Sequence, residues 1–460
     1  MAKRQRVLRF EMPYAMNDPI LLNPQLGIHR VHQRGVGKGR SSKEVTLLDT
    51  PDHRLLRAGI VLAHRVVDGL GEWYLDAPGW GPWLPTRRTE ALGAAGDLPE
   101  AFADLVRPFR RHAPLGPVAA LTSTRQEWQL ADEQGVALGR VRDDKLSIRR
   151  GGVTTARYRE VTLIAQAELT REQRNFVVEA LLGVGGTRVE EFPTLVERIG
   201  APATGLTDFR GPHELAQNAT LESFVSWVFG HRLDGIMRAD LSLRSGETDD
   251  MDLLRNQLAE LRREVRSLSF ALEPHWRAQM EADIDVVLAG LAGRSARQLG
   301  DEYFTVLDHL VVAIRAPRLG DMSQQQAREL LVQQSVKGIT ILFDRARGLN
   351  LSSPDDRWLA TLASAQQMHA VARTNRLLFR KRARRMEESL EETIALLRAS
   401  QMPHNLTEPH IELDWDPVTA FQEGRRFERR RNEIASSRRH FVEAWPGLEE
   451  RIRKSRKKQP

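Results

Sequence analysis

Basic side chains follow one another at helical spacing near residue 370. The residues in question, one every three or four positions, are His369, Arg373, Arg376, Arg380 and Arg384. A single helix would place them in one stripe, where like charges repel one another by about 0.2–0.5 kcal/mol per pair. An unneutralised stripe of this kind is explained if an external polyanion binds to it. The alternative is a solvated helix face, helped by the acidic residues about one turn onward, Glu387, Glu388 and Glu391.

The stripe lies in a region whose apolar residues recur with the period of a helix. After residue 215 such segments include 219–241, 249–270, 301–316, 323–346 and 354–398. Pro274, Pro317 and Pro354 separate several of them, as expected where helices begin or end. The pattern predicts an all-α bundle. It also predicts that 354–398, which carries the stripe, is one long helix.

The region before residue 200 has a different pattern. Short β-rich runs alternate with turn residues, and two helices are predicted at 98–109 and 170–182. The second opens with a capping box from Thr170 to Gln173. Many short antiparallel strands with few helices indicate an α+β module, which suggests a closed β structure. The boundary between the two modules is predicted near 205–212.

Composition narrows the functional classes. The 460 residues include no cysteine, which excludes disulfides, thiol nucleophiles and zinc–thiolate sites. No apolar run reaches the roughly 20 residues of a membrane span, and the basic start lacks the apolar stretch of a signal peptide. A cytoplasmic protein without membrane insertion is expected. The net charge of +7 is concentrated in 425–460, where thirteen Lys or Arg face five Glu. The stretch 449–460 is expected to be a disordered basic tail.

One sequence segment in the first module resembles a family signature. Leu48-Asp-Thr-Pro-Asp-His-Arg-Leu-Leu-Arg-Ala-Gly59 resembles the signature of the CYTH family. Trp73-Tyr-Leu, Arg88-Thr-Glu90, Thr124-Arg125 and Arg159-Glu160-Val161 follow in the family's order, so the resemblance covers about residues 5–200, within a predicted domain 1–205. It implies an antiparallel β-barrel or tunnel that binds triphosphates and, with a divalent metal, hydrolyses or cyclises them.

The resemblance also implies which residues would act. Family carboxylates hold Mg²⁺ or Mn²⁺, and arginines bind phosphate oxygens. The chain departs from the pattern: Arg9-Phe-Glu11-Met-Pro13 replaces Glu-x-Glu-x-Lys, and Asp76 replaces a lysine. The candidates that remain are Glu11, Glu90 and Glu160 for a metal, and Arg65, Arg88 and Arg125 for phosphate. A lone carboxylate holds these ions poorly, so the module is predicted to have lost catalysis.

The helical region resembles a second family. Met368-His369-Ala-Val-Ala-Arg373 and the basic residues after it resemble the signature helix of the CHAD domain, over a predicted domain 213–448. CHAD domains are helical bundles of two similar halves, and an altered copy of the motif is identified at 251–266, with Arg255, Arg262 and Arg266. The resemblance implies that inorganic polyphosphate binds in a basic groove between the halves, with no cofactor required.

Three functions therefore follow from the sequence. The first is binding of inorganic polyphosphate or a similar polyanion by the helical module, without catalysis. The second is a metal-dependent triphosphatase acting on tripolyphosphate or a nucleoside triphosphate in the first module. The third is nucleic-acid binding through the basic tail, although no DNA- or RNA-reading motif is present. A scaffold in which neither module binds a ligand remains an alternative.

Overall fold

The computed structural model describes residues 6–34, 40–67, 70–84, 88–91, 98–209, 211, 214–216, 218–291, 293–379, 381–401 and 416–457. The chain divides into two compact units. The first unit comprises 1–209 together with 240–249, and the second comprises 210–239 and 250–460. The sequence placed the boundary at 205–212, and the return of 240–249 to the first unit was not foreseen.

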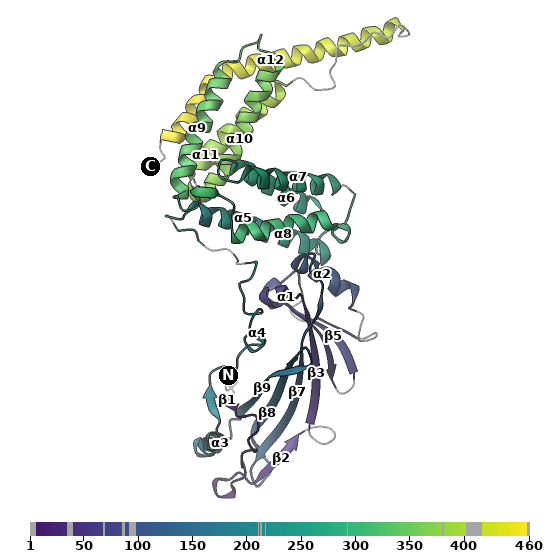
Figure 1. Cartoon of the computed structure of the whole chain (residues 1–460), viewed down its shortest axis with the longest axis vertical. Coiled ribbons are helices and arrows are strands. Elements are labelled where there is room, and N and C mark those ends of the chain that lie inside the picture. The colour runs from purple at the N-terminus through teal and green to yellow at the C-terminus, as the bar shows by residue number, and fades with distance from the viewer. Residues whose placement is uncertain are drawn as a thin grey trace. The chain divides into compact units, whose positions relative to one another are not determined.

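The first unit is built on one antiparallel sheet (Figure 1). Its strands are β1 (Arg6–Met12), β2 (Arg30–Arg34), β3 (Arg40–Asp49), β4 (Val61–Val67), β5 (Leu70–Asp76), β6 (Arg88–Ala91), β7 (Gly116–Ala131), β8 (Ala137–Arg150), β9 (Val153–Ala165) and β10 (Thr187–Val189). The strand order is β10-β1-β9-β8-β7-β3-β4-β5-β6, with β2 paired to β7. The predicted antiparallel α+β module is confirmed. The predicted closure is not: the described pairings form an open sheet.

Four short helices accompany the sheet: α1 (Arg54–Arg57), α2 (Glu100–Arg110), α3 (Arg171–Gly183) and α4 (Leu195–Ile199). The predicted capping box is present at the start of α3. The Thr170 amide donates to Gln173 Oε1 at 2.9 Å, and the Gln173 amide donates to Thr170 Oγ1 at 3.2 Å. Helix α3 packs Val177 and Leu181 against one face of the sheet, in a core that includes Phe10.

The two faces of the sheet differ because side chains alternate along each strand. Phe10, Val141 and Val161 point toward the core beneath α3. The intervening positions form the opposite face, which is charged over β1, β9 and β8. Toward β3 and β4 this second face becomes apolar and packs against Ile199 of α4. The sheet therefore has one mainly apolar face, which also holds the buried Arg159–Asp143 ion pair, and one face that is part charged and part apolar.

The second unit is helical, as predicted (Figure 1). Its helices are α5 (Leu221–Arg244), whose residues from Asp240 belong to the first unit, α6 (Asp252–Ser267), α7 (Pro274–Gly290), α8 (Asp301–Arg315), α9 (Ala327–Arg347), α10 (Asp355–Phe379), α11 (Lys381–Ala399) and α12 (Pro417–Lys457). None of the described helices has the length and apolar character needed to cross a membrane.

The segment predicted as one helix at 354–398 is a helical hairpin. Helix α10 ends at Phe379, and α11 begins at Lys381 and packs along α10. Contacts between the two helices show that the chain reverses direction: His369 Nε2 lies 3.3 Å from Glu391 Oε1, and Arg376 Nη1 lies 3.1 Å from Glu387 Oε2. No glycine or proline marks the turn, so the periodicity of the sequence runs through it.

The predicted disordered tail at 449–460 is wrong for 449–457. Helix α12 continues to Lys457, and Ile452 is fully buried in the core of the second unit. Leu448 and Ile452 lie four residues apart, so they share one apolar stripe of the helix. Arg451 is paired with Glu392. Residues 458–460 lie outside the described chain.

Candidate functional site

Two adjoining cavities lie among the helices of the second unit. The larger, of about 840 Å³, is lined by side chains of α6, α7, α10 and α11. The smaller, of about 180 Å³, is lined by α5, α6, α10 and α11. Arg263, Ala370 and Arg373 line both cavities, so the two cavities adjoin. We call the two cavities together, with all their lining residues, the arginine groove.

The arginine groove is strongly charged with a positive excess. Its charged lining side chains are the seven arginines Arg232, Arg263, Arg266, Arg277, Arg373, Arg376 and Arg398, and the five glutamates Glu260, Glu264, Glu281, Glu387 and Glu391. Seven positive and five negative charges leave a formal charge of +2 before His231 and His369 are considered. The groove therefore favours an anion, although much of its own positive charge is already paired.

Arg373 lies where the two cavities meet. Its Nη2 donates to Glu260 Oε1 of α6 at 2.5 Å, and its Nε lies 3.6 Å from Glu387 Oε1 of α11. About a third of the side chain, 36%, remains exposed. Arg376, 56% exposed, shares Glu387 with it. Arg373 therefore joins three helices while keeping part of its guanidinium open to a ligand.

The structure separates the residues of the predicted stripe. His369, Arg373 and Arg376 line the groove from α10. Arg384 lies on α11 outside the lining and pairs with Glu388 at 3.0 Å. Arg380 lies outside the described residues. The predicted stripe was expected to lack neutralising charges. The hairpin instead brings the glutamates of α11 beside α10, where they pair with the basic residues.

The arginines of the altered motif at 251–266 are also separated by the structure. Arg266 lines the groove and pairs with Glu281 of α7 at 2.9 Å. Arg262 pairs with Asp285 at 2.5 Å and Arg255 with Asp252 at 3.2 Å, and neither lines the groove. Arg263, next to Arg262 in sequence, lines both cavities in its place.

Sequence reasoning missed several groove arginines, of which Arg398 is the most informative. It lies near the end of α11, is exposed, and its guanidinium has no hydrogen bond or ion pair among the described residues. Arg232, Arg263 and Arg277 were missed as well. They come from helices distant in sequence, so only the hairpin and the tertiary packing bring them together. Helical spacing from Arg266 back to Arg263 was the one available signal.

A buried ion pair forms one wall of the smaller cavity. Arg232 donates from Nη2 to Glu264 Oε1 at 2.5 Å and from Nε to Glu264 Oε2 at 3.0 Å, in a bidentate pair. Burial raises the pKa of the Glu264 carboxyl above its ordinary value, and the bonds from Arg232 offset only part of that effect. As the pH falls, the Glu264 carboxyl therefore becomes neutral at a higher pH than an ordinary glutamate.

Three groove residues could reach one metal ion. The ligand atoms of His369, Glu387 and Glu391 lie within 4.8 Å of one another, the one such group in the described part of the chain. Glu387 is already bonded by Arg376 and lies beside Arg373. A cation bound there would have to displace two guanidinium groups, so the surroundings fit an anion better than a metal.

In the first unit, candidate residues on four neighbouring strands lie directly opposite one another. Glu11 of β1 faces Glu160 of β9, Glu160 faces Asp144 of β8, and Asp144 faces Arg125 of β7. Asp144 was not singled out from the sequence. Its signal was present in the alternation of β8, where Arg142 and Asp144 share the charged face of the sheet.

Arginines already neutralise most of these carboxylates. Arg198 pairs with Glu160, and Arg125 Nε donates to Asp144 Oδ1 at 2.6 Å. Arg65, the remaining described phosphate candidate, pairs with Glu72. On β6, the backbone at Arg88 and Glu90 pairs with Leu75 and Trp73, and the side chains of Arg88 and Glu90 lie outside the described residues.

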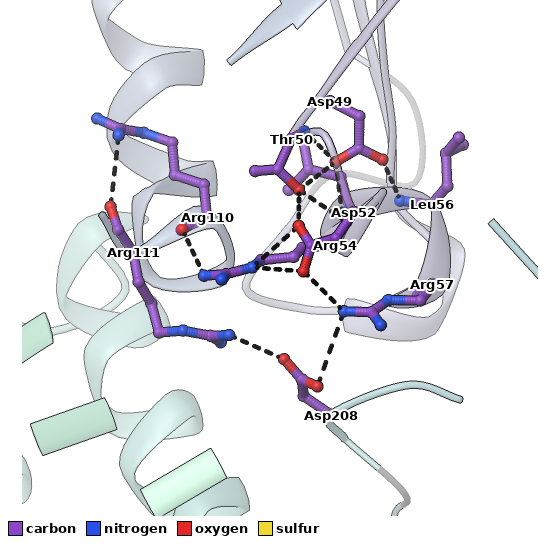
Figure 2. A network of polar contacts seen from close by, with 10 residues as sticks. Asp49, Thr50, Asp52, Arg54, Leu56, Arg57, Arg110, Arg111 and Asp208 are labelled. Carbon is purple, nitrogen blue, oxygen red and sulfur yellow. Dashed lines mark hydrogen bonds and ion pairs between the residues drawn. The ribbon is translucent and has the colours of Figure 1, made fainter. Parts of the chain in front are cut away.

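The Asp-Thr-Pro-Asp segment forms part of a polar network that holds a helix (Figure 2). Asp49 accepts hydrogen bonds from the amides of Thr50, Leu55 and Leu56 at 2.7–2.9 Å, so its carboxylate fixes the first turn of α1. In Figure 2, Asp52 lies between Thr50 and the guanidinium groups that follow. The Thr50 hydroxyl donates to the same carboxylate at 3.4 Å, so these Asp49 bonds stay within residues 49–56 and hold the start of α1.

The network extends to the end of the first unit. Arg111 donates to Asp208 at 2.9 Å, and both side chains are 3% exposed. Arg57 lies 3.9 Å from the same carboxylate. Phe209 packs edge-on against Trp80 and Phe109, with ring centroids 5.2 and 5.4 Å apart. The chain up to Phe209 is therefore bound to the first unit by charge and by aromatic packing.

Comparison with known proteins gives distant similarity only. No family model matches the chain. Two uncharacterised proteins from Mycobacterium tuberculosis strains, MT2285 (CDC 1551 / Oshkosh) and Rv2226 (ATCC 25618 / H37Rv), are each 26% identical over 309 residues, 62% of this chain. The chain spans 57% of the length of these curated relatives. Their names record no activity.

Solved structures give partial matches to this chain. A candidate adenylate cyclase from Bacillus halodurans is 17% identical and covers 35% of this chain and 84% of its own, with a TM-score of 0.21. A second candidate adenylate cyclase, from Vibrio parahaemolyticus, is 15% identical over 42% of this chain and 97% of its own, with a TM-score of 0.20. At these TM-scores the matches do not establish a shared fold.

Proposed function

We propose that the protein binds a linear polyanion, inorganic polyphosphate or one of similar charge density, in the arginine groove of the second unit. The observation that carries the proposal is the meeting of seven arginines from five helices around two adjoining cavities, with the Arg398 guanidinium unpaired among the described residues. Arginine suits this role because its guanidinium binds phosphate oxygens with two parallel hydrogen bonds. A cytoplasmic location and independence from a metal belong to the same proposal.

The five groove glutamates set the class of ligand. The binding free energy of a weakly charged anion is too small to separate Arg373 or Arg376 from Glu387. A chain of closely spaced phosphates contacts several arginines at once and releases its counterions, which favours binding at low salt. The proposal therefore expects little binding of orthophosphate and strong, salt-dependent binding of long-chain polyphosphate.

Charge reversal at Arg398 tests the groove directly. Arg398→Glu in the full chain is expected to weaken binding of labelled long-chain polyphosphate about tenfold, which is about 1.4 kcal/mol. The slope of log Kd against log salt should fall by roughly 0.7, one phosphate contact. Arg384→Glu is the matched control: it lies on the same helix and belongs to the predicted stripe, but it lies outside the groove. Equal losses in the two variants would refute the groove as the site.

Acidification should strengthen binding. The pKa of Glu264 is raised, so its carboxyl becomes neutral at a higher pH than an ordinary glutamate, and the formal charge of the groove rises from +2 to +3. Polyphosphate affinity is expected to increase about three- to tenfold as the pH falls through the raised pKa of Glu264 at constant salt. The pH dependence of Glu264→Gln is compared with that of the wild type. If the pH dependence is unchanged in Glu264→Gln, Glu264 has no part in it.

Competition separates a polyphosphate site from a general basic surface. The full chain is titrated with labelled polyphosphate while RNA of equal charge is added. Poor competition by RNA supports the groove, because RNA is wider and carries fewer charges per unit length. Equal displacement by RNA would contradict the proposal and favour nucleic-acid binding. The helix end that replaces the predicted basic tail has its own ion pairs, among them Arg453 with Glu449 and Lys454 with Glu450.

A further inference from the structure

The charged face of the first unit carries a row of carboxylates from three adjacent strands. Glu11, Glu160 and Asp144 lie directly opposite one another on β1, β9 and β8. Directly opposed side chains on an antiparallel sheet are close neighbours, and like charges there destabilise the sheet. Burial raises the pKa of Glu160, and the charges of Asp144 and Glu11 act in the same direction. The row therefore requires positive charge from elsewhere.

Arg198 of α4 supplies that charge to the centre of the row. Its Nη2 donates to Glu160 Oε1, and its guanidinium lies over the ring of Tyr158 at 4.1 Å from the centroid. Its Nε donates to the Pro193 carbonyl at 3.1 Å. Only 6% of the Arg198 side chain is exposed, against 16% of Glu160. Stacking, hydrogen bonding and burial together fix this arginine in one place.

The local sequence positions Arg198. Thr194 and Glu197 form a capping box that starts α4: the Thr194 amide donates to Glu197 Oε2 at 2.7 Å, and the Glu197 amide donates to Thr194 Oγ1 at 3.3 Å. Ile199 anchors the other end of this short helix in the core. Arg198, between them, is thereby directed onto the sheet. The guanidinium is held by the fold and not by chance contact of two surface side chains.

Arginines also hold the Asp144 end of the row. Arg125 binds Asp144 with Nε at 2.6 Å and Nη2 at 3.3 Å, and Arg142 Nε lies 3.2 Å from Asp144 Oδ2. A divalent ion needs several oxygen ligands converging on one point. The oxygens of Glu11, Glu160 and Asp144 do not converge in this way, since the one group of convergent ligand atoms among the described residues is in the second unit. The residues therefore do not fit the Mg²⁺ or Mn²⁺ that the family resemblance implies.

We propose that Arg198 is the resident counter-cation of this carboxylate row, in place of a divalent metal. The row then stabilises the first unit through internal ion pairs, and its carboxylates are not free to hold a catalytic metal. Because the carboxylate oxygens do not converge on one point, removal of the Arg198 guanidinium should not create a divalent-metal site.

A double-mutant cycle in the full chain tests the pairing. Arg198→Gln leaves a largely buried carboxylate without its partner, and the unfolding midpoint of the first unit should fall by about 4–8 °C. Glu160→Gln should lower it by a similar amount. The fall in the unfolding midpoint of the double variant should be clearly smaller than the sum of the falls in the two single variants. Arg140 and Glu127, paired at 3.4 Å on the same sheet and more exposed, provide the matched control pair, for which additive and smaller losses are expected.

Manganese shows whether the row can hold a metal. With millimolar Mn²⁺, the unfolding midpoint of Arg198→Gln should not recover. Free Mn²⁺, followed by its paramagnetic resonance signal, should show the same binding by the wild type, Arg198→Gln and Glu160→Gln. The His369 group is present in every variant, so any binding there cancels in the comparison. Glu160-dependent Mn²⁺ binding by the wild type, additive losses in the cycle, or recovery of Arg198→Gln in Mn²⁺ would each overturn the proposal.

Discussion

Replacing Arg373 by glutamate is expected to weaken binding of long-chain polyphosphate by about 100-fold at 0.1 M salt, a loss of about 2.7 kcal/mol. Arg373 is the one cation at the junction of the two cavities that also contacts carboxylates on two further helices. The substitution removes a phosphate contact and adds a negative charge beside Glu260 and Glu387. A ligand that follows the whole groove must pass this position, so no other single reversal should cost as much.

The measurement is a salt titration of polyphosphate binding by the full chain, with circular dichroism to show that the helices persist. Arg373→Met separates the two effects, because it keeps much of the side-chain volume and removes only the positive charge. It should cost about tenfold. Arg384→Glu again serves as the exposed control on the neighbouring helix. A loss at Arg373→Glu no larger than at Arg384→Glu would rule out a ligand that spans both cavities.

Replacing Arg244 by methionine is expected to destabilise the first unit by about 3–5 kcal/mol, the cost of removing one partner from a buried ion pair. Arg244 and Asp240 are both fully buried, with Nε and Oδ1 2.8 Å apart, and Arg244 also pairs with Asp104 of α2. Without the guanidinium, the Asp240 carboxylate is left inside the protein with no opposite charge at that bond.

The same helix provides a matched comparison. Arg238 and Asp234 of α5 form an i,i+4 pair at 3.0 Å, with side chains 53% and 21% exposed. Spacing and residue types are the same as in the Arg244 pair, but the side chains are more exposed, and Arg244 also pairs with Asp104. Arg238→Met should cost less than about 1 kcal/mol. Chemical denaturation of the two variants measures the difference. Similar losses in both would mean that burial does not set the strength of the Arg244 pair.

The sequence predicted the architecture because the local signals were strong and consistent. The capping box at Thr170 opens α3 as expected. The sequence Asp132-Glu-Gln-Gly135 is typical of a hairpin turn, and Gly135, where φ is 86°, lies in the turn that joins β7 to β8. Closure of the sheet was expected from the many short antiparallel strands and from the family resemblance. No local signal in this chain specifies closure, because strand order depends on pairings between residues far apart in sequence.

The site was less predictable than the fold for a specific reason. Neither a glycine nor a proline separates α10 from α11 in the sequence, so periodicity alone extends one helix across their boundary. That extension placed Arg384 in line with Arg373 and put Glu387 beyond the stripe. The hairpin reverses both placements. Arg398 was overlooked because its relation to Arg373 depends on the reversal, whereas His369 and Arg376 were identified from local spacing that does persist.

The assignment of 240–249 to the first unit has a consequence for how the chain can be divided. Helix α5 starts among residues of the second unit and finishes with Asp240 and Arg244 buried in the first. Cleavage of the peptide backbone near residue 211 would therefore not release an independent helical fragment, since the fragment would still carry ten residues that belong to the other unit. Nicked protein should migrate as one particle until it is denatured, and recombinant fragments meeting at 211 should be soluble together and aggregate apart.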